Sequence, residues 1–228
     1  MDADRDAQVA AVAALAEPTR RRLYDHVVRQ PQPVSRDEVA GELGVPRATA
    51  AFHLDRLVAE GLLDVHYERR SGRSGPGAGR PAKLYRRAAC SVAVSLPERH
   101  YDLAGELLAG ALEEADATGE SPRVVLERRA RERGRELDAR AAGGDGAEPA
   151  LRVLDEHGFE PRREGAAITL ANCPFHALAQ RHTTLVCGMN LRLLEGLLDE
   201  LAGTGLTARL APARDRCCVR LEACADTG

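Results

Sequence analysis

The stretch RATAAFHLDRLVAE, residues 47–60, decides the fold of the first part of the chain. Its apolar side chains recur at the spacing of an α-helix and form one stripe: Ala50, Leu54, Leu57 and Val58. The spacing therefore predicts a helix with one buried face. Four side chains are predicted to project from the opposite face, where they can contact another molecule: Thr49, Phe52, His53 and Arg56.

A second short helix is predicted just upstream, over residues 35–43. Ser35 and Glu38 have the spacing of a capping box, which starts a helix, and Gly44 suits the left-handed conformation that ends one. Helix, glycine turn and helix together form a helix-turn-helix, which places its second helix in the major groove of DNA. Before it we expect one helical segment over residues 7–29, broken early at Pro18, with Thr19 capping its longer part.

Two short strands are predicted after the helix pair, from LLDVHYERR at residues 62–70 and AKLYRRA at residues 82–88. They enclose a basic, glycine-rich loop, which we interpret as a wing. The tip of this wing, at residues 71–79, has too few apolar side chains to fold on itself, and we expect it to be mobile without DNA. Seven Lys and Arg side chains face a single Glu between residues 66 and 88, as expected of a surface that binds phosphates.

The predicted DNA contacts come from the second helix and the wing. Arg47 and Arg56 are the strongest candidates, because a guanidinium can donate two parallel hydrogen bonds to guanine or phosphate. His53 either faces DNA or is an ordinary surface histidine, and Phe52 either touches a thymine methyl or packs on the first helix. The wing is expected to set affinity through phosphates. The complete predicted set is Arg47, Thr49, Phe52, His53, Arg56, Arg69, Arg70, Arg73, Arg80 and Lys83.

The order of these pieces resembles the winged-helix domain of ArsR-type bacterial repressors. The resemblance covers about the first 88 residues and is carried by LAEPTRRRLYDHV at 15–27, the helix pair, AFHLDRLVAEGLL at 51–63 and GRPAKLYRR at 79–87. It implies a winged helix that binds a double-stranded DNA operator.

The composition fits two small domains. The chain has 228 residues, no Trp and three Phe, so its cores must be built on Leu, Val and Ala. The formal net charge is −3, yet residues 1–90 carry 15 Lys plus Arg against 12 Asp plus Glu. No apolar run approaches the roughly 18 residues that cross a membrane, and the acidic start is unlike a signal peptide. We therefore expect a cytoplasmic protein without disulfides, which leaves the six cysteines for other roles.

We predict an α+β protein of three parts: a winged helix-turn-helix domain at 7–88, a helical linker and dimerisation region at 89–145, and a sensor domain at 146–224. Within the linker a helix is expected to start at Pro97, and residues 123–142 read as a solvated connecting helix before the break at GGDGAEP. The linker's apolar stripe packs either against its own domain or, as we prefer, against a second subunit. That stripe consists of Ala104, Leu107, Leu108, Ala111 and Leu112.

The sensor domain is predicted to contain three helices and three strands. The helices are expected from LRVLDEHGF, CPFHALAQRHTTLVC and MNLRLLEGLLDELAGTG, so the last two are separated just after Cys187. The strands are expected from REGAAITLAN, where a turn leads into the strand, and from LTARLAP and CCVRLEA. This pattern indicates a small α+β domain.

Four of the six cysteines fall at predicted element ends in this domain. Cys173 precedes a helix N-terminus, where the peptide dipoles favour thiolate, the form that binds metal. Cys187 can approach it only if the chain doubles back. Cys217 and Cys218 are adjacent in a predicted strand, so only one of them joins a given site unless a bulge intervenes, and alternation favours Cys217 facing the core. The alternative for each cysteine is a small buried hydrophobe, and we assign Cys90 and Cys224 to that role.

This half of the chain resembles the C-terminal half of SufR-like iron-sulfur repressors, through NCPFHALAQRH, VC, LLEGLL and CCV. The resemblance implies that Cys173, Cys187, Cys217 and Cys218 bind a [4Fe-4S] or [2Fe-2S] cluster. Zinc is the alternative metal, and His176 could then replace one thiolate, because it lies on the same helical face three residues after Cys173.

These patterns lead to a homodimeric DNA-binding repressor that senses redox state or iron through a cysteine-ligated iron-sulfur cluster. The alternative is a repressor gated by an organic ligand, in which zinc or free thiols only hold the domain together. We predict no enzymatic activity, because Cys173 has no evident His and Asp or Asn partners to act as base and orienting group.

Overall fold

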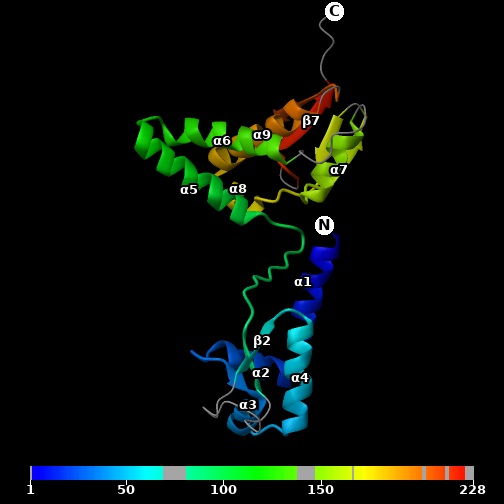
Figure 1. The fold of residues 1–228 in the computed structure, drawn as a ribbon. Helices are drawn as coiled ribbons and strands as arrows, with labels where there is room; N and C mark the ends of the chain where they lie inside the picture. Colours follow the sequence, from blue (N-terminus) through cyan, green and yellow to red (C-terminus); the bar gives the residue numbers. More distant parts are fainter. Residues whose placement is uncertain are drawn as a thin grey trace, which may run out of the picture. The chain divides into compact units, whose positions relative to one another are not determined.

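The chain forms two compact units in a computed structural model, Met1–Val94 and Ser95–Gly228 (Figure 1). The structure describes residues 2–68, 81–137, 147–165, 167–201, 204–213 and 216–223. The predicted wing tip lies outside these residues, as do five side chains discussed above: Arg69, Arg70, Arg73, Arg80 and Cys224.

The first unit begins with two helices, α1 (Asp2–Ala14) and α2 (Pro18–Val28), which divide the segment expected over residues 7–29. The break at Pro18 is confirmed, but the cap is not Thr19. The carboxylate of Glu17 accepts hydrogen bonds from the backbone N–H groups of Thr19 and Arg20, at 2.9 and 2.6 Å. A carboxylate suits this position because it also complements the positive end of the helix dipole.

The helix-turn-helix is confirmed in α3 (Arg36–Leu43) and α4 (Arg47–Ala59). The capping box forms as expected: the N–H of Glu38 donates to Ser35 Oγ at 3.3 Å, and the N–H of Ser35 donates to Glu38 Oε2 at 2.7 Å. Gly44 ends α3 in the left-handed conformation, with φ 64°. Because these signals are local, the sequence alone was enough to place both helices.

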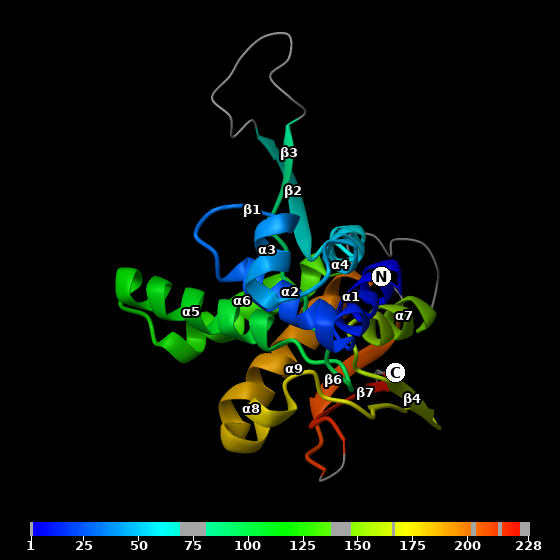
Figure 2. The same cartoon turned by 90° about the horizontal axis from the view of Figure 1, so that it is seen from below.

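A three-stranded antiparallel sheet completes this unit, with β3 (Ala82–Arg87) between β1 (Val34–Ser35) and β2 (Leu63–Glu68). β2 and β3 run out together as a two-stranded arm beside α3 and α4 (Figure 2). Under the arm lies a core of buried side chains from all four helices and the sheet, which includes Leu23, Val27, Val39, Leu54, Leu57, Leu63 and Tyr85. The predicted apolar stripe of α4 packs into this core and fixes the helix in place.

The second unit starts with a helical hairpin, α5 (Tyr101–Thr118) and α6 (Pro122–Glu136). α5 begins at Tyr101, four residues after Pro97, where we had placed its start. α6 is not a solvated connecting helix, because it packs on both α5 and α9 (Thr183–Glu200) and buries four positions: Val125, Leu126, Ala130 and Gly134. The region expected to be a separate linker thus shares one core with the sensor domain.

The α5 stripe also packs inside its own unit. Ala104, Leu107, Ala111 and Ala115 are buried in that core, whereas Leu112 is 56% exposed. The small alanines let α5 approach α6 closely, so the alternative of packing against its own domain accounts for most of this stripe.

The rest of the second unit is a four-stranded antiparallel sheet with helices packed against it. The strand order is β4 (Pro161–Glu164), β5 (Ala167–Leu170), β7 (Val219–Ala223) and β6 (Leu206–Leu210). α7 (Glu148–Glu156) contacts β4, and α9 contacts β6 and β7. The strand expected from REGAAITLAN after a turn is β5, and the turn connects it to β4, a strand that we had not predicted. The sequence pattern hid β4, because the strand Pro161–Glu164 is almost entirely polar and exposed.

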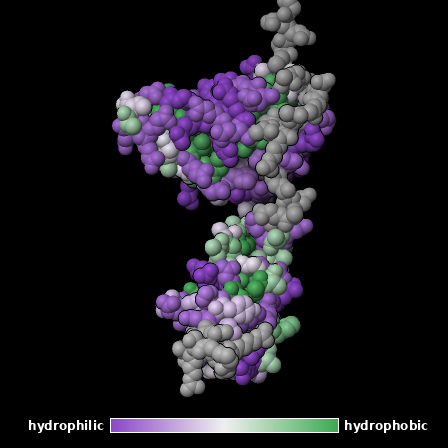
Figure 3. Space-filling model, in the orientation of Figure 1, coloured by the Kyte–Doolittle hydropathy of each residue, from purple (hydrophilic) through white to green (hydrophobic). Residues whose placement is uncertain are grey.

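Helices α8 (His176–Arg181) and α9 are separated at His182, not after Cys187 as we predicted. The turn at His182 therefore lies before Cys187 and places this cysteine in the first turns of α9. The surface of the second unit is mostly hydrophilic in the view of Figure 3. No helix in the described residues combines the length and apolar character needed to cross a membrane.

Candidate nucleic-acid interface and thiol cluster

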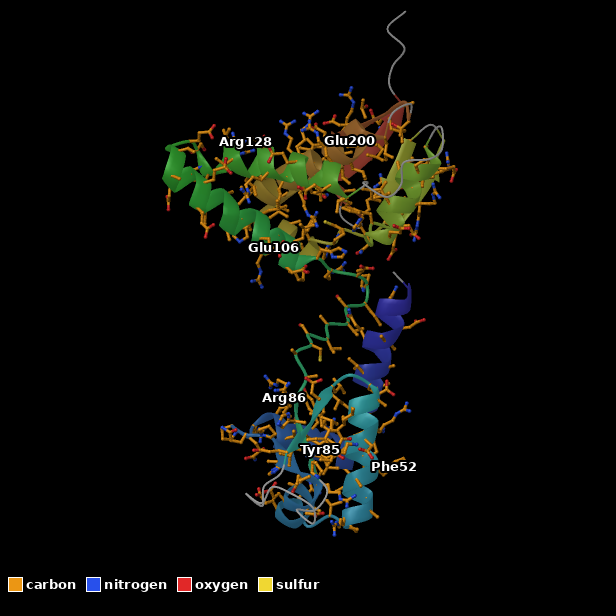
Figure 4. The ribbon with its side chains drawn as sticks, viewed as in Figure 1. Phe52, Tyr85, Arg86, Glu106, Arg128 and Glu200 are labelled. Atoms are coloured by element: carbon orange, nitrogen blue, oxygen red, sulfur yellow. The ribbon has the colours of Figure 1, made fainter. Side chains whose placement is uncertain are left out.

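The outer face of α4 carries one large apolar side chain, Phe52, which is 68% exposed. It points away from the unit in Figure 4, whereas Tyr85 is buried inside it. A phenyl ring this exposed loses the free energy of burial unless another molecule covers it. Phe52 therefore does not pack on the first helix, which was one of the two readings of its role.

The two arginines of α4 are exposed and already ion-paired. Arg47 forms two contacts to the carboxylate of Asp37 on α3, one of them a hydrogen bond from Nη2 at 2.7 Å. Arg56 pairs with Glu60 one turn along at 2.5 Å. Exposed pairs of this kind contribute little stability, so both guanidinium groups can exchange their carboxylate for a phosphate or a base at low cost.

His53 does not project freely from α4 as we expected. Its side chain is only 12% exposed, and Nε2 lies 3.6 Å from Glu17 Oε2 at the start of α2. Its Nδ1 is buried and has no hydrogen-bond partner within the described part of the chain. The helical spacing placed His53 on the face opposite the stripe, but α2 packs against α4, and Glu17 at the start of α2 lies beside the ring. A direct DNA contact by His53 remains a prediction from the sequence alone.

Asp55 ties the middle of α4 to the wing strand β3. Its Oδ1 accepts hydrogen bonds from Lys83 Nζ at 2.5 Å and from the hydroxyl of Tyr85 at 2.9 Å. Burial raises the pKa of Asp55, but these hydrogen bonds outweigh burial and hold it below its usual value. Burial, followed by the bond to Asp55, raises the pKa of Tyr85 to about 12. Lys83, which we predicted as a DNA contact, thus also ties β3 to α4.

A polar hollow lies between α3, α4 and the arm. Its lining includes both members of the Asp37–Arg47 pair and the linked groups of Asp55, Lys83 and Tyr85. Two of these side chains, Arg47 and Lys83, are cations from our predicted contact set. The hollow therefore presents polar and charged groups from both α4 and β3.

The structure brings the four predicted cysteines of the second unit together, although they come from three segments. Cys173 precedes α8, Cys187 lies in the first turns of α9, and Cys217 and Cys218 directly precede β7. The thiol of Cys173 interacts with that of Cys217, Cys217 interacts with Cys218, and Cys218 interacts with Cys187. All four are free cysteines, and only Cys218 is partly exposed. The chain does double back, as joining Cys187 to Cys173 required.

The interactions among the thiols shift their pKa values in different directions. A hydrogen bond from Cys218 lowers the pKa of Cys187 against the opposing effect of burial. The pKa of Cys173 is raised, first by its hydrogen bond to Cys217 and then by burial. The helix dipole was expected to favour the thiolate of Cys173, whereas the raised pKa favours its thiol. Burial and a neighbouring thiol outweigh the backbone N–H of Phe175, which acts in the expected direction.

Both adjacent cysteines take part, contrary to the expectation that only one would. Cys217 is 2% exposed and faces the core, as predicted. However, β7 begins only at Val219, so the strict alternation of a strand does not apply to Cys217 and Cys218. Both side chains can therefore turn toward the same place.

Polar groups that the sequence did not single out surround these thiols. Asn190 of α9 is 1% exposed, and its Nδ2 donates to Cys217 Sγ at 3.2 Å. Its Oδ1 has no hydrogen-bond partner in the described ranges. The sequence did contain a signal for this contact, because Asn190 falls among the apolar positions of α9. A buried amide normally has hydrogen-bond partners, so an Asn there indicates a polar group nearby. His176, by contrast, is exposed and contacts Gln180 at 3.0 Å.

The donor chemistry of this thiol cluster, defined as Cys173, Cys187, Cys217 and Cys218, fits a metal centre. Thiolate is the preferred ligand of zinc and of iron-sulfur clusters. Thiols that raise one another's pKa cannot all ionise together unless a cation compensates the charge. The thiols interact in pairs, and no group of three or more His, Cys, Asp or Glu in the described residues is arranged to hold a metal ion. Ligation would therefore require them to converge further.

Comparison with known proteins bears on the first unit. Residues 15–66 match a family described as a helix-turn-helix domain. No curated protein matches the chain significantly. The match runs from just before α2 into β2 and includes α4 with its exposed face, and it points to a DNA-binding transcription regulator.

Proposed function

We propose that this chain is a homodimeric transcriptional repressor that senses redox state or iron through an iron-sulfur cluster bound by Cys173, Cys187, Cys217 and Cys218. The observation that carries the proposal is the convergence of these four thiols, from three segments, in one largely buried place. Cysteines that only fill space in a core would not need to lie close to one another.

Reading of DNA is assigned to α4 and the arm. Phe52 is the exposed apolar group that can meet a thymine methyl in the major groove. Arg47 and Arg56 are exposed cations on the same helix, and Lys83 stands on the adjacent strand. The apolar ring contributes sequence choice, the two arginines can contact bases or phosphates, and the cations together contribute affinity through phosphates.

Sensing is assigned to the thiol cluster. An iron-sulfur cluster bound there would supply a centre whose charge and integrity change with oxidant and iron supply. The chain's own contribution is to hold four donors, to donate a hydrogen bond from Asn190 to Cys217, and to lower the pKa of Cys187 through its hydrogen bond with Cys218. Because the donors come from the loop before α8, from α9 and from the approach to β7, ligation joins three segments, and its binding free energy is also folding free energy.

Dimer formation is supported by the general use of twofold pairs by helix-turn-helix proteins. The buried α5 stripe does not supply the interface, so we assign it to side chains that remain exposed. Candidates that lie on helices include Val9 and Val12 of α1, Leu112 of α5 and Val124 of α6, each between 46% and 56% exposed. Sedimentation of the purified chain tests this part, and a monomer at micromolar concentration would contradict it.

The sensing proposal is tested by purifying the full chain under nitrogen and measuring iron, sulfide and zinc per chain with the visible absorption spectrum. We expect a coloured protein with equal amounts of iron and sulfide. Zinc without iron would favour the alternative of a structural metal. Neither metal, together with full titration of the free thiols, would exclude the thiol cluster as a metal centre.

A further inference from the structure

The first residues of the second unit run along the loop that carries Cys173. The backbone N–H of His100 donates to the carbonyl oxygen of Pro174 at 3.1 Å. One residue later, the hydroxyl of Tyr101 accepts a hydrogen bond from the N–H of Ala177 at 3.3 Å. Residues 98–101, which follow the end of the DNA-binding unit at Val94 by only a few positions, are therefore bound to the thiol-bearing loop at two places.

A third and denser set of hydrogen bonds joins Arg99 to Asn172. Arg99 Nη1 donates to Asn172 Oδ1 and, at 3.2 Å, to the carbonyl oxygen of Cys173 itself. Asn172 Nδ2 donates to the carbonyl oxygens of Glu98 at 3.1 Å and Gly158 at 2.6 Å. Asn172 is 7% exposed, and both ends of its amide are occupied, so it has little freedom to rotate.

This arrangement sets the position of Cys173. Its carbonyl is held by a guanidinium, and the residue before it is held by the chain segment that comes from the other unit. A cation that binds a backbone carbonyl and a side-chain amide together forms charge-assisted hydrogen bonds, which are stronger than neutral ones. A shift of Cys173 therefore requires either the loss of these bonds or a matching shift of residues 98–101.

We propose that Arg99 and Asn172 couple the state of the thiol cluster to the chain segment that enters the second unit from the DNA-binding unit. Arg99 acts as a positioning residue, since it touches the backbone of a ligand and not the ligand's sulfur. The inference rests on the proposed sensing function and adds the route of the signal. Coupling requires that the loop around Cys173 prefer different conformations in the ligated and metal-free states. Because Arg99 is bound to this loop, a change in the loop's preferred conformation changes the preferred position of residues 98–101.

The test is a comparison of three full-length proteins: wild type, Arg99→Ala and Arg163→Ala. Arg163 serves as the control because it is an exposed arginine of the same unit whose ion pair, with Glu148, lies away from the loop. Each protein is prepared under nitrogen in a metal-free form and in a form loaded with ferrous iron and sulfide, with Zn²⁺ in parallel. Affinity is measured for a duplex selected from random sequences by the wild type.

We expect the ratio of DNA affinities between the two forms to lie in the ordinary allosteric range, about 5- to 150-fold, in wild type and Arg163→Ala. In Arg99→Ala the ratio falls to within about twofold of one, while metal content per chain is retained. A merely structural role would lower metal content or both affinities and leave their ratio unchanged, and that result would overturn the inference. A wild-type ratio of one would overturn the sensing function itself, and the coupling with it.

A measurement on the unaltered protein covers the case in which Arg99→Ala does not fold. Amide hydrogen exchange of residues 98–101 is compared between metal-free and loaded wild type. We expect slower exchange of the His100 and Tyr101 amides in the loaded form, with no change in α2 as the internal reference. Equal exchange in the two forms would overturn the coupling even if the metal binds.

Discussion

Gly134 of α6 lies so close to Leu193 of α9 that a β-carbon on the glycine would sit 1.9 Å from the carbonyl oxygen of Leu193. The contact is reciprocal, because a β-carbon on Gly196 of α9 would sit 1.9 Å from the carbonyl oxygen of Arg131 on α6. The two helices thus touch backbone to backbone. Since Cys187 lies on α9, this contact fixes one donor of the thiol cluster relative to the helical hairpin.

The close contact predicts that Gly134→Ala destabilises the second unit. A methyl group at this site must push two backbones apart, and overpacking of this kind costs about 1–3 kcal/mol or more. Gly105→Ala on α5 is the control, because nothing lies within 4 Å of its added β-carbon. There the better helix propensity of Ala stabilises by about 0.5–1 kcal/mol. Urea denaturation followed by circular dichroism gives both values, and equal stabilities of the two variants would contradict the packing.

Phe52→Ala is predicted to lower specific DNA affinity about tenfold with no loss of folding stability. Burial of an aromatic ring contributes about 1.5–3 kcal/mol when complete, and this ring is covered only in the complex. Uracil in place of thymine in the selected duplex removes the methyl group and should weaken wild-type binding similarly. On Phe52→Ala, the uracil duplex should bind as well as the thymine duplex. Additive losses would show that the ring and the methyl group do not meet.

The raised pKa of Tyr85 leads us to predict that the first unit loses stability at alkaline pH. Its pKa is raised to about 12 by burial and the bond to Asp55, against about 10 in an unfolded chain. The folded form thus keeps its proton longer, so the stabilisation is complete below pH of about 10 and disappears as pH rises through about 12. Tyr85→Phe should remove this pH dependence. Denaturation midpoints between pH 9 and 12 measure it, and the same slope in both proteins would exclude Tyr85 as its source.

The first unit could be predicted closely because its signals are local. The Ser35–Glu38 capping box, Gly44 and the stripe on α4 each act within a few residues, and all three form as predicted. The errors arose where another element intervenes. Burial of His53 depends on α2, which lies more than 20 residues away in the sequence, and no periodicity within α4 reports it.

The second unit shows the same division between local and distant effects. The four cysteines were identified from their place at element ends, but their mutual contacts depend on the turn at His182 and on the exact start of β7. Neither is marked by a Gly or a Pro. The stripe of α5 was assigned to a second subunit because the sequence could not show that α6, which is densely charged, also carries a narrow buried face. Its arginines occupy the outer side in ion pairs, such as Arg131 with Asp199 at 2.7 Å.

The central claim is that ligation of the thiol cluster controls DNA binding, and the most direct test is a DNA titration of loaded and metal-free protein under nitrogen. It compares wild type with Cys187→Ser and with Cys90→Ser, in which the replaced cysteine is exposed and lies in the first unit. We predict that iron and sulfide change operator affinity by about 5-fold or more in wild type and Cys90→Ser, and that Cys187→Ser binds no metal and shows no change. Equal metal content and an equal change of affinity in all three proteins would contradict the account.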